Sequence, residues 1–159
     1  MLRVAVIDGQ GGGIGKHITA KIRKELPLEE VEILALGTNA MATAAMLKAG
    51  ANEGATGENA IVRNAGLVDV IVGSLGIVLA EGMLGEVTPR MAASIAASPA
   101  LKLLLPLNRS GVEVIGVTGE PLPHLIDKLV ARLKEWAEAT GKLKGGPREE
   151  KAEEGKTSV

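Results

Sequence analysis

Residues 8–16 are the part of the sequence best suited to bind a phosphate group. Five of the seven residues 9–15 are glycine, and the run follows the apolar residues 2–7 and precedes apolar positions with helical spacing. Glycines let backbone N–H groups approach an anion, and a helix N-terminus adds partial positive charge. We predict ligand contacts from Asp8, Gly9, Gln10, Gly11, Gly12, Gly13, Ile14, Gly15 and Lys16. The alternative is a glycine turn that serves only close packing of strand and helix.

The spacing of the glycines distinguishes between known phosphate loops. Gly9, Gly13 and Gly15 fit the pattern G-x-x-x-G-x-G, which resembles the nucleotide loop of the short-chain dehydrogenase/reductase family. The pattern G-x-G-x-x-G fails, because Ile14 stands at its last glycine. The resemblance implies NAD(P) or another nucleotide as a possible cofactor, and the cofactor itself is not identified. The chain contains no tyrosine, so that family's tyrosine-dependent reduction is excluded.

An ATPase loop fits less well. Residues 12–16 resemble the deviant Walker loop of the ATPases related to nitrogenase iron protein and partition proteins, but they lack its early lysine. The standard Walker A pattern needs glycine where Gln10 stands, and Ser or Thr for Mg²⁺ where His17 stands. We therefore expect no ATP hydrolysis, and we predict no metal site.

Further candidate ligand contacts follow the second and third predicted strands. Thr38 and Asn39 come after one, and Gly73 and Ser74 come after the other. Parallel sheets bind ligands at the carboxyl ends of their strands, so these residues should converge with the glycine loop. Dinucleotide folds place Asp or Glu after the second strand to hold the ribose, and neither stands there. Thr38 or Asn39 could equally be a helix N-cap.

No complete catalytic set can be named, so the catalytic residues are unknown. Lys16, His17 and Glu58 are the candidates for an enzyme acting on a phosphorylated or carboxylated metabolite. Residues 52–59 form a polar loop that could close over a ligand or simply cap the next helix. Glu81 and Glu86 lie in an apolar segment, where an exposed edge explains them as well as catalysis does. A small-molecule-binding module is the leading hypothesis, followed by the enzyme and then by a structural protein with an empty glycine turn.

The elements that position these residues alternate between strand and helix. Strands are predicted at residues 2–7, 31–36, 69–72, 101–105 and 112–117, with helices at 14–26, 40–49, 58–66, 89–97 and from 121 to about 140. The pattern predicts a three-layer, Rossmann-like α/β fold with a mostly parallel sheet of about five strands. Only six residues separate the last two strands, which favours an antiparallel hairpin at one edge. Residues 1–141 form the predicted domain, and the charged residues 142–159 form a flexible tail.

The composition limits the cellular location and the binding partners that we expect. The formal net charge is −1, and one tryptophan is the sole aromatic residue, which disfavours a nucleic-acid surface. No apolar run reaches membrane-spanning length, so we expect a cytoplasmic protein with no membrane contact. The apolar stretches 40–49 and 73–87 exceed what one small domain is expected to hide. We therefore expect a homodimer whose seam includes one of them, with Met46 at the helical seam.

Three segments together resemble a small family of uncharacterised bacterial and archaeal Rossmann-like proteins, defined only as a domain of unknown function. The segments are residues 6–15, with the loop DGQGGGIG, residues 35–40 (ALGTNA), and residues 50–60 (GANEGATGENA). The resemblance covers residues 4 to about 130. It implies a nucleotide-binding type of fold and no particular reaction.

Overall fold

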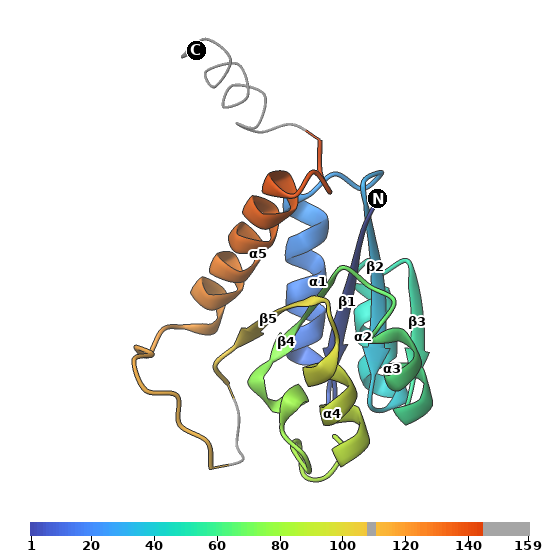
Figure 1. Cartoon of the computed structure of the whole chain (residues 1–159), viewed down its shortest axis with the longest axis vertical. Helices are drawn as coiled ribbons and strands as arrows, with labels where there is room; N and C mark the ends of the chain where they lie inside the picture. The colour runs from blue at the N-terminus through green and yellow to red at the C-terminus, as the bar shows by residue number, and fades with distance from the viewer. Residues whose placement is uncertain (108–110, 145–159) are drawn as a thin grey trace.

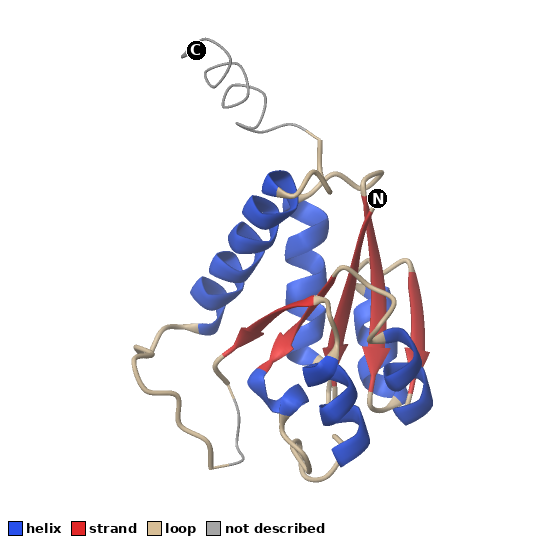
Figure 2. Cartoon of the chain, viewed as in Figure 1, coloured by secondary structure: helices blue, strands red, loops and turns tan. Residues whose placement is uncertain are grey.

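The chain folds into one parallel β-sheet covered by helices on both faces (Figures 1 and 2). The computed structural model describes residues 1–107 and 111–144. Its strands are β1 (Leu2–Asp8), β2 (Val31–Gly37), β3 (Glu53–Thr56), β4 (Val70–Ser74) and β5 (Leu101–Leu105). Its helices are α1 (Gly13–Glu25), α2 (Ala40–Lys48), α3 (Glu58–Asn64), the 3-10 helix η1 (Leu75–Val78), α4 (Pro89–Ala97) and α5 (Leu122–Ala139).

The strand order is β3-β2-β1-β4-β5, with every neighbouring pair parallel. Strand β1 lies at the centre, and both of its faces are apolar. Val4 and Val6 pack into one core with Ile18 of α1, while Ala5 and Ile7 pack into the other. The first core also receives α2 and α5, and the second receives α3 and α4. The predicted three-layer, Rossmann-like α/β fold is confirmed.

The antiparallel edge hairpin was a wrong prediction. Strand β5 pairs in parallel with β4, and residues 111–120 form no strand. Gly111 and Gly116 have φ of 71° and 92°, which interrupts an extended chain despite the alternating valines. Because no strand follows β5 there, the short connection does not constrain the direction of pairing.

The fifth strand is instead β3, which the sequence analysis placed inside a polar loop. Glu53, Gly54, Ala55 and Thr56 have little strand propensity, and most of this strand is exposed. It pairs with β2 from Leu34 opposite Glu53 to Gly37 opposite Thr56, and the hydroxyl of Thr56 lies 2.7 Å from that of Thr43 in α2. Strand β3 therefore separates Asn52 and Glu58, which the predicted polar loop had combined.

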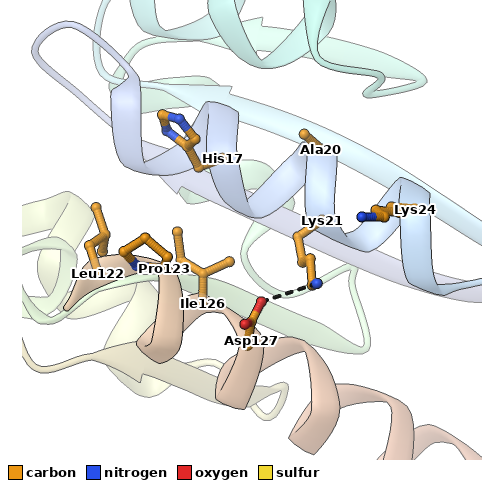
Figure 3. A pocket seen from close by; sticks show the side chains of 8 residues that line it. All are labelled: His17, Ala20, Lys21, Lys24, Leu122, Pro123, Ile126 and Asp127. Atoms are coloured by element: carbon orange, nitrogen blue, oxygen red, sulfur yellow. Dashed lines mark ion pairs between the residues drawn. The ribbon is translucent and has the colours of Figure 1, made fainter. Parts of the chain in front are cut away.

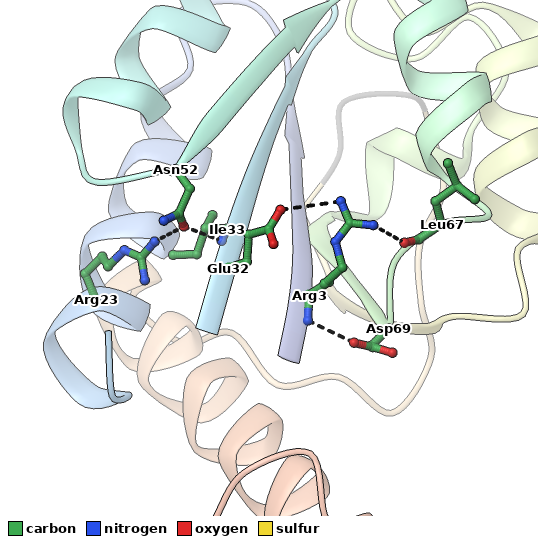
Figure 4. Close-up of polar contacts among 7 residues, drawn as sticks. All are labelled: Arg3, Arg23, Glu32, Ile33, Asn52, Leu67 and Asp69. Carbon is green, nitrogen blue, oxygen red and sulfur yellow. Dashed lines mark hydrogen bonds and ion pairs between the residues drawn. The ribbon is translucent and has the colours of Figure 1, made fainter. Parts of the chain in front are cut away.

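The amino end of the sheet is tied together by two arginines (Figure 4). Arg3 donates its backbone N–H to the carboxylate of Asp69 at 2.8 Å. Arg23 donates to Asn52, whose Oδ1 also accepts the backbone N–H of Ile33 at 2.7 Å. Burial lowers the pKa of Arg23. Asn52 thus braces the end of the sheet opposite the glycine loop, so it is not part of the candidate site.

The chain continues past α5 as folded structure for a few residues. Leu143 is buried against the first core, and Lys142 pairs with Asp69 at 3.1 Å. The rest of the predicted tail, residues 145–159, lies outside the described residues. Among the helices that the structure describes, none combines the length and apolar character needed to cross a membrane.

Candidate functional site

The glycine loop lies at the carboxyl end of β1, beside the carboxyl ends of β2 and β4. Asp8 is in register with Gly37, and the backbone N–H of Thr38 donates to the carbonyl of Asp8 at 3.0 Å. The structure therefore brings Thr38 and Asn39 next to the loop, as the parallel sheet predicted.

The side chain of Asp8 forms hydrogen bonds within the glycine loop. Its Oδ1 accepts the N–H of Gly9 at 2.8 Å, and its Oδ2 accepts the N–H of Gly15 at 2.7 Å. The side chain is buried, and this burial raises the pKa of Asp8; the two hydrogen bonds oppose the rise, and the nearby charge of Glu86 adds to it. The carboxylate holds the shape of the loop and consumes two of the N–H groups that a phosphate could use.

Three of the loop glycines are required by packing. A Cβ on Gly15 would lie 2.6 Å from Sδ of Met46, and one on Gly9 would lie 2.8 Å from Sδ of Met83. Gly12 has a left-handed φ of 74° and would place its Cβ 2.8 Å from Cα of Ala42. At these three positions close packing, mainly against α2 and the turn that precedes α4, is sufficient to explain glycine.

Gly11 and Gly13 are different. Both are exposed, neither has a left-handed φ, and a Cβ on either would meet no atom within 4 Å. The backbone N–H groups of Gly11, Gly13 and Ile14 make no hydrogen bond to any residue that the structure describes. Three backbone donors at the start of α1 are thus open, beside two glycines that the fold itself does not need.

Glu86 lies at the site, although its sequence context fits an exposed edge as well as a catalytic role. It reaches the glycine loop from the connection between η1 and α4. Its Oε1 accepts the N–H of Gln10 at 2.9 Å, the hydroxyl of Thr38 at 2.7 Å and Nδ2 of Asn39 at 2.7 Å. The bond from Gln10 is the main reason that the pKa of Glu86 is lowered; burial opposes it, and the side chains of Thr38 and Asn39 support it. The signal in the sequence was a carboxylate within an apolar segment.

The polar side chains after β2 are engaged within the protein. Oδ1 of Asn39 caps α2 by accepting the N–H of Ala42 at 2.9 Å, which confirms the N-cap alternative. Its Nδ2 donates to the carbonyl of Gln10 at 2.9 Å as well as to Glu86. Asn39 and Thr38 therefore position Glu86 against the loop.

Gly73 and Ser74, at the end of β4, are buried. A Cβ on Gly73 would lie 2.7 Å from the carbonyl oxygen of Ile7, so close approach of the strands accounts for this glycine. Neither residue is exposed beside the loop.

The segment that carries Glu86 has an unusual backbone. Glu81, Met83 and Leu84 have left-handed φ angles of 65°, 57° and 57°. Such conformations are costly for residues other than glycine and persist only where the surroundings impose them. Hydrogen bonds between Glu81 and Val87 (2.8 Å) and between Val87 and Gly82 (3.0 Å) close this turn. The turn holds Met83 and Glu86 against the glycine loop.

The three candidate catalytic residues are not assembled. Nδ1 of His17 lies 2.6 Å from the carbonyl oxygen of Gly13. Oε2 of Glu58 accepts the hydroxyl of Thr88 at 2.6 Å, at the start of α4. Within the described ranges, no hydrogen bond or ion pair joins Lys16, His17 and Glu58 to one another.

A separate hollow of about 330 Å³ lies between α1 and α5 (Figure 3). Its walls are mostly apolar, and an ion pair of 3.1 Å between Lys21 and Asp127 crosses it. The residues lining it are His17, Ala20, Lys21, Lys24, Leu122, Pro123, Ile126 and Asp127. It contains none of the loop residues 8–16, so it is distinct from the candidate phosphate site.

The fold and the loop define an α/β protein of Rossmann-like topology with a glycine-rich turn after the first strand. The model of the family described as Domain of unknown function (DUF3842) matches residues 3–138, and the chain belongs to this family. No curated protein and no solved structure matches the chain. The resemblance to an uncharacterised domain family is confirmed.

Proposed function

We propose that this protein binds a nucleotide or another phosphate-bearing small molecule at the glycine loop. The observation that carries the proposal is the pair Gly11 and Gly13, where glycine is needed neither for backbone conformation nor for packing. The N–H groups of Gly11, Gly13 and Ile14 are open beside them, at the positive end of α1. Donors of this kind suit an anion that must approach the backbone closely.

The carboxylates restrict where the phosphate lies. Asp8 occupies the N–H groups of Gly9 and Gly15, and Glu86 occupies that of Gln10. Both carboxylates would repel a phosphate, so we place it at the N–H groups of residues 11–14 that the carboxylates do not occupy. This position is narrower than the prediction from glycine spacing, in which all of residues 8–16 contact the ligand.

A binding module fits better than an enzyme. His17 and Glu58 make contacts within the protein, and among residues 1–107 and 111–144 no nucleophile with an adjacent base is assembled at the loop. The polar groups that do converge hold one another in place. A nucleotide ligand would also suit the cytoplasmic location that we propose.

The test compares two glycine substitutions that the fold should tolerate equally. A Cβ at Gly13 meets no atom of another segment within 4 Å, and the same is true of Gly66, which precedes β4 at the other end of the sheet. We would measure binding of ADP, NAD and inorganic phosphate by native mass spectrometry and calorimetry for wild type, Gly13→Val and Gly66→Val.

We expect wild type and Gly66→Val to bind at least one of these probes, and Gly13→Val to lose at least about tenfold in affinity, since a side chain would stand where the anion approaches. Equal melting temperatures of the two variants would show that the loss is local. Equal affinity of Gly13→Val and wild type would show that the loop is structural.

A further inference from the structure

We propose that Glu86 is the acceptor for the ribose hydroxyls of the bound nucleotide, so that the site selects a ribose with a free 2′-hydroxyl. This inference rests on the proposed function and narrows its ligand to ribonucleotides without a 2′-phosphate. The sequence places no carboxylate directly after β2, and the fold supplies one from the turn before α4.

The expected place for such a carboxylate is the end of β2, where an acidic side chain can reach the ribose while the phosphates lie on the glycine turn. This chain has Thr38 and Asn39 there. Oε1 of Glu86 lies 2.7 Å from the side chains of both. Glu86, 48 positions after Thr38, therefore puts a carboxylate at the carboxyl end of β2. We call this place, where Gln10, Thr38, Asn39 and Glu86 meet, the corner of the sheet.

The two oxygens of Glu86 have different surroundings. Oε1 accepts all three hydrogen bonds, from Gln10, Thr38 and Asn39. Oε2 accepts none from the part of the chain that the structure describes, and the side chain is half-buried. The bonds to Oε1 fix the carboxylate while Oε2 keeps its capacity to accept hydroxyl donors. A vicinal diol supplies two such donors.

Two exposed apolar side chains are close in sequence to the residues of this corner, and we assign them to the base of the same ligand. Met41 is 69 % exposed and lies two residues after Asn39, while Leu84 is 96 % exposed and lies two residues before Glu86. They belong to the two segments that the hydrogen bond between Glu86 and Asn39 joins. A purine base placed there would cover apolar surface that the folded chain leaves in water.

The negative charge at this corner also predicts which nucleotides should bind weakly. A 2′-phosphate would bring negative charge to Glu86, whose hydrogen-bond donors Gln10, Thr38 and Asn39 are all uncharged. A 2′-deoxyribose would leave the carboxylate without one of its hydroxyl donors, at the cost of a charge-assisted hydrogen bond.

The experiment measures the affinities of ADP, 2′-deoxy-ADP, NAD and NADP by calorimetry for wild type, Glu86→Gln and Glu81→Gln. Glutamine keeps an oxygen for the donors at Oε1 and replaces the second oxygen by an N–H donor. Glu81→Gln is the matched control, because this exposed carboxylate lies on the same turn. Native mass spectrometry of each protein reports its oligomeric state.

We expect wild type and Glu81→Gln to bind ADP at least about tenfold more tightly than 2′-deoxy-ADP, and NAD more tightly than NADP. In Glu86→Gln the two ADP affinities should agree within about twofold. Equal binding of ADP and 2′-deoxy-ADP by wild type would overturn the inference, as would discrimination that survives in Glu86→Gln.

Two further outcomes separate this inference from the proposed function. Binding of inorganic phosphate that is lost in Gly13→Val, without binding of ADP or NAD, would overturn the ribose inference alone. No binding of any probe would overturn both. A ligand-independent dimer that dissociates in Leu84→Ser, with unchanged nucleotide affinity, would assign the exposed apolar pair to a second copy and would overturn the base position.

Discussion

The side chains of Glu86 and Thr38, 48 residues apart, are joined by a hydrogen bond of 2.7 Å at the carboxyl end of the sheet. This bond ties the turn that precedes α4 to the end of β2, and the bond from Gln10 N–H adds the glycine loop to the same carboxylate. Three segments that are distant in the sequence thus depend on one side chain. The charge state of Glu86 should therefore affect the stability of the whole corner.

The first prediction concerns pH. The pKa of Glu86 is lowered in the folded protein, so its stabilising effect is fully present above the ordinary value of 4.5 and is lost as the pH falls through the folded value. Glu86→Gln should destabilise the protein by on the order of 1 kcal/mol at pH 7 and by progressively less below about pH 4.5. Thermal unfolding of both proteins between pH 3 and 7 measures this difference.

The stability of wild type must be compared with that of Glu86→Gln at each pH, because Asp8 also titrates. Its pKa is raised by burial, so the cost of its charge is present above its folded pKa and is relieved as the pH falls. This trend is opposite to that of Glu86. It should be present in both proteins and smaller in Glu86→Gln, because the charge of Glu86 contributes to raising the pKa of Asp8. A gap between wild type and Glu86→Gln that stays constant from pH 3 to 7 would contradict the electrostatic explanation.

The second prediction separates the two kinds of glycine in the loop. A Cβ on Gly15 would lie 2.6 Å from Sδ of Met46 and 2.9 Å from Cβ of Asp8, whereas one on Gly13 meets nothing within 4 Å. Gly15→Ala should lower the free energy of unfolding by about 1–3 kcal/mol through overpacking. Gly13→Ala should leave it unchanged or raise it by up to about 1 kcal/mol. Urea unfolding checks both, and equal effects would contradict the packing argument.

Much of the fold was predictable because buried elements carry their own pattern. Strand β1 is apolar on both faces, and Ile18 and Ile22 mark the buried side of α1. Strand β3 was missed because it is an exposed edge strand whose position depends on backbone pairing with β2. The valines of residues 111–120 predicted a strand that does not form, since alternation alone does not supply a partner strand.

The candidate site was predictable only in part. The parallel sheet correctly placed Thr38 and Asn39 beside the glycine loop. The contact of Glu86 with both could not be predicted, because a turn with three left-handed residues other than glycine sets its direction. Spacing also could not show that Asp8 binds the loop, or that Gly11 and Gly13 are the two loop glycines without packing constraints.

The third prediction is that ATP hydrolysis stays at background. The side chain of Lys16 makes no hydrogen bond or ion pair within the described part of the chain, and His17 stands where a Walker loop holds Mg²⁺ by a hydroxyl. Phosphate release from ATP with and without Mg²⁺ measures this for wild type and Lys16→Ala. Turnover that requires Mg²⁺ and disappears in Lys16→Ala would restore the Walker interpretation.

The fourth prediction concerns the homodimer, whose proposed interface cannot be the helix that contains Met46. Met46 is completely buried in the core of the single chain, so it cannot lie at a subunit seam, and Met46→Glu should unfold the protein rather than separate subunits. Most of residues 73–87 is also covered by the same chain, with Ile77 and Val87 buried. Alanine and glycine pack closely enough for one domain to absorb both stretches.

The apolar surface left exposed includes the connection before α5, which Figure 1 shows running outside the sheet. Ile115 is 88 % exposed there, with Val114 at 44 % and Val117 at 46 %. We therefore propose this connection as the seam of a two-fold dimer, in which each copy covers the same side chains of the other. Sedimentation equilibrium at micromolar concentration should give twice the chain mass of 16.3 kDa for wild type, and the chain mass for Ile115→Glu. Leu28→Glu, at a position 65 % exposed in the turn before β2, is the control and should remain dimeric. A wild-type mass of one chain would refute the dimer, and a dimer that survives Ile115→Glu would place the seam on another surface.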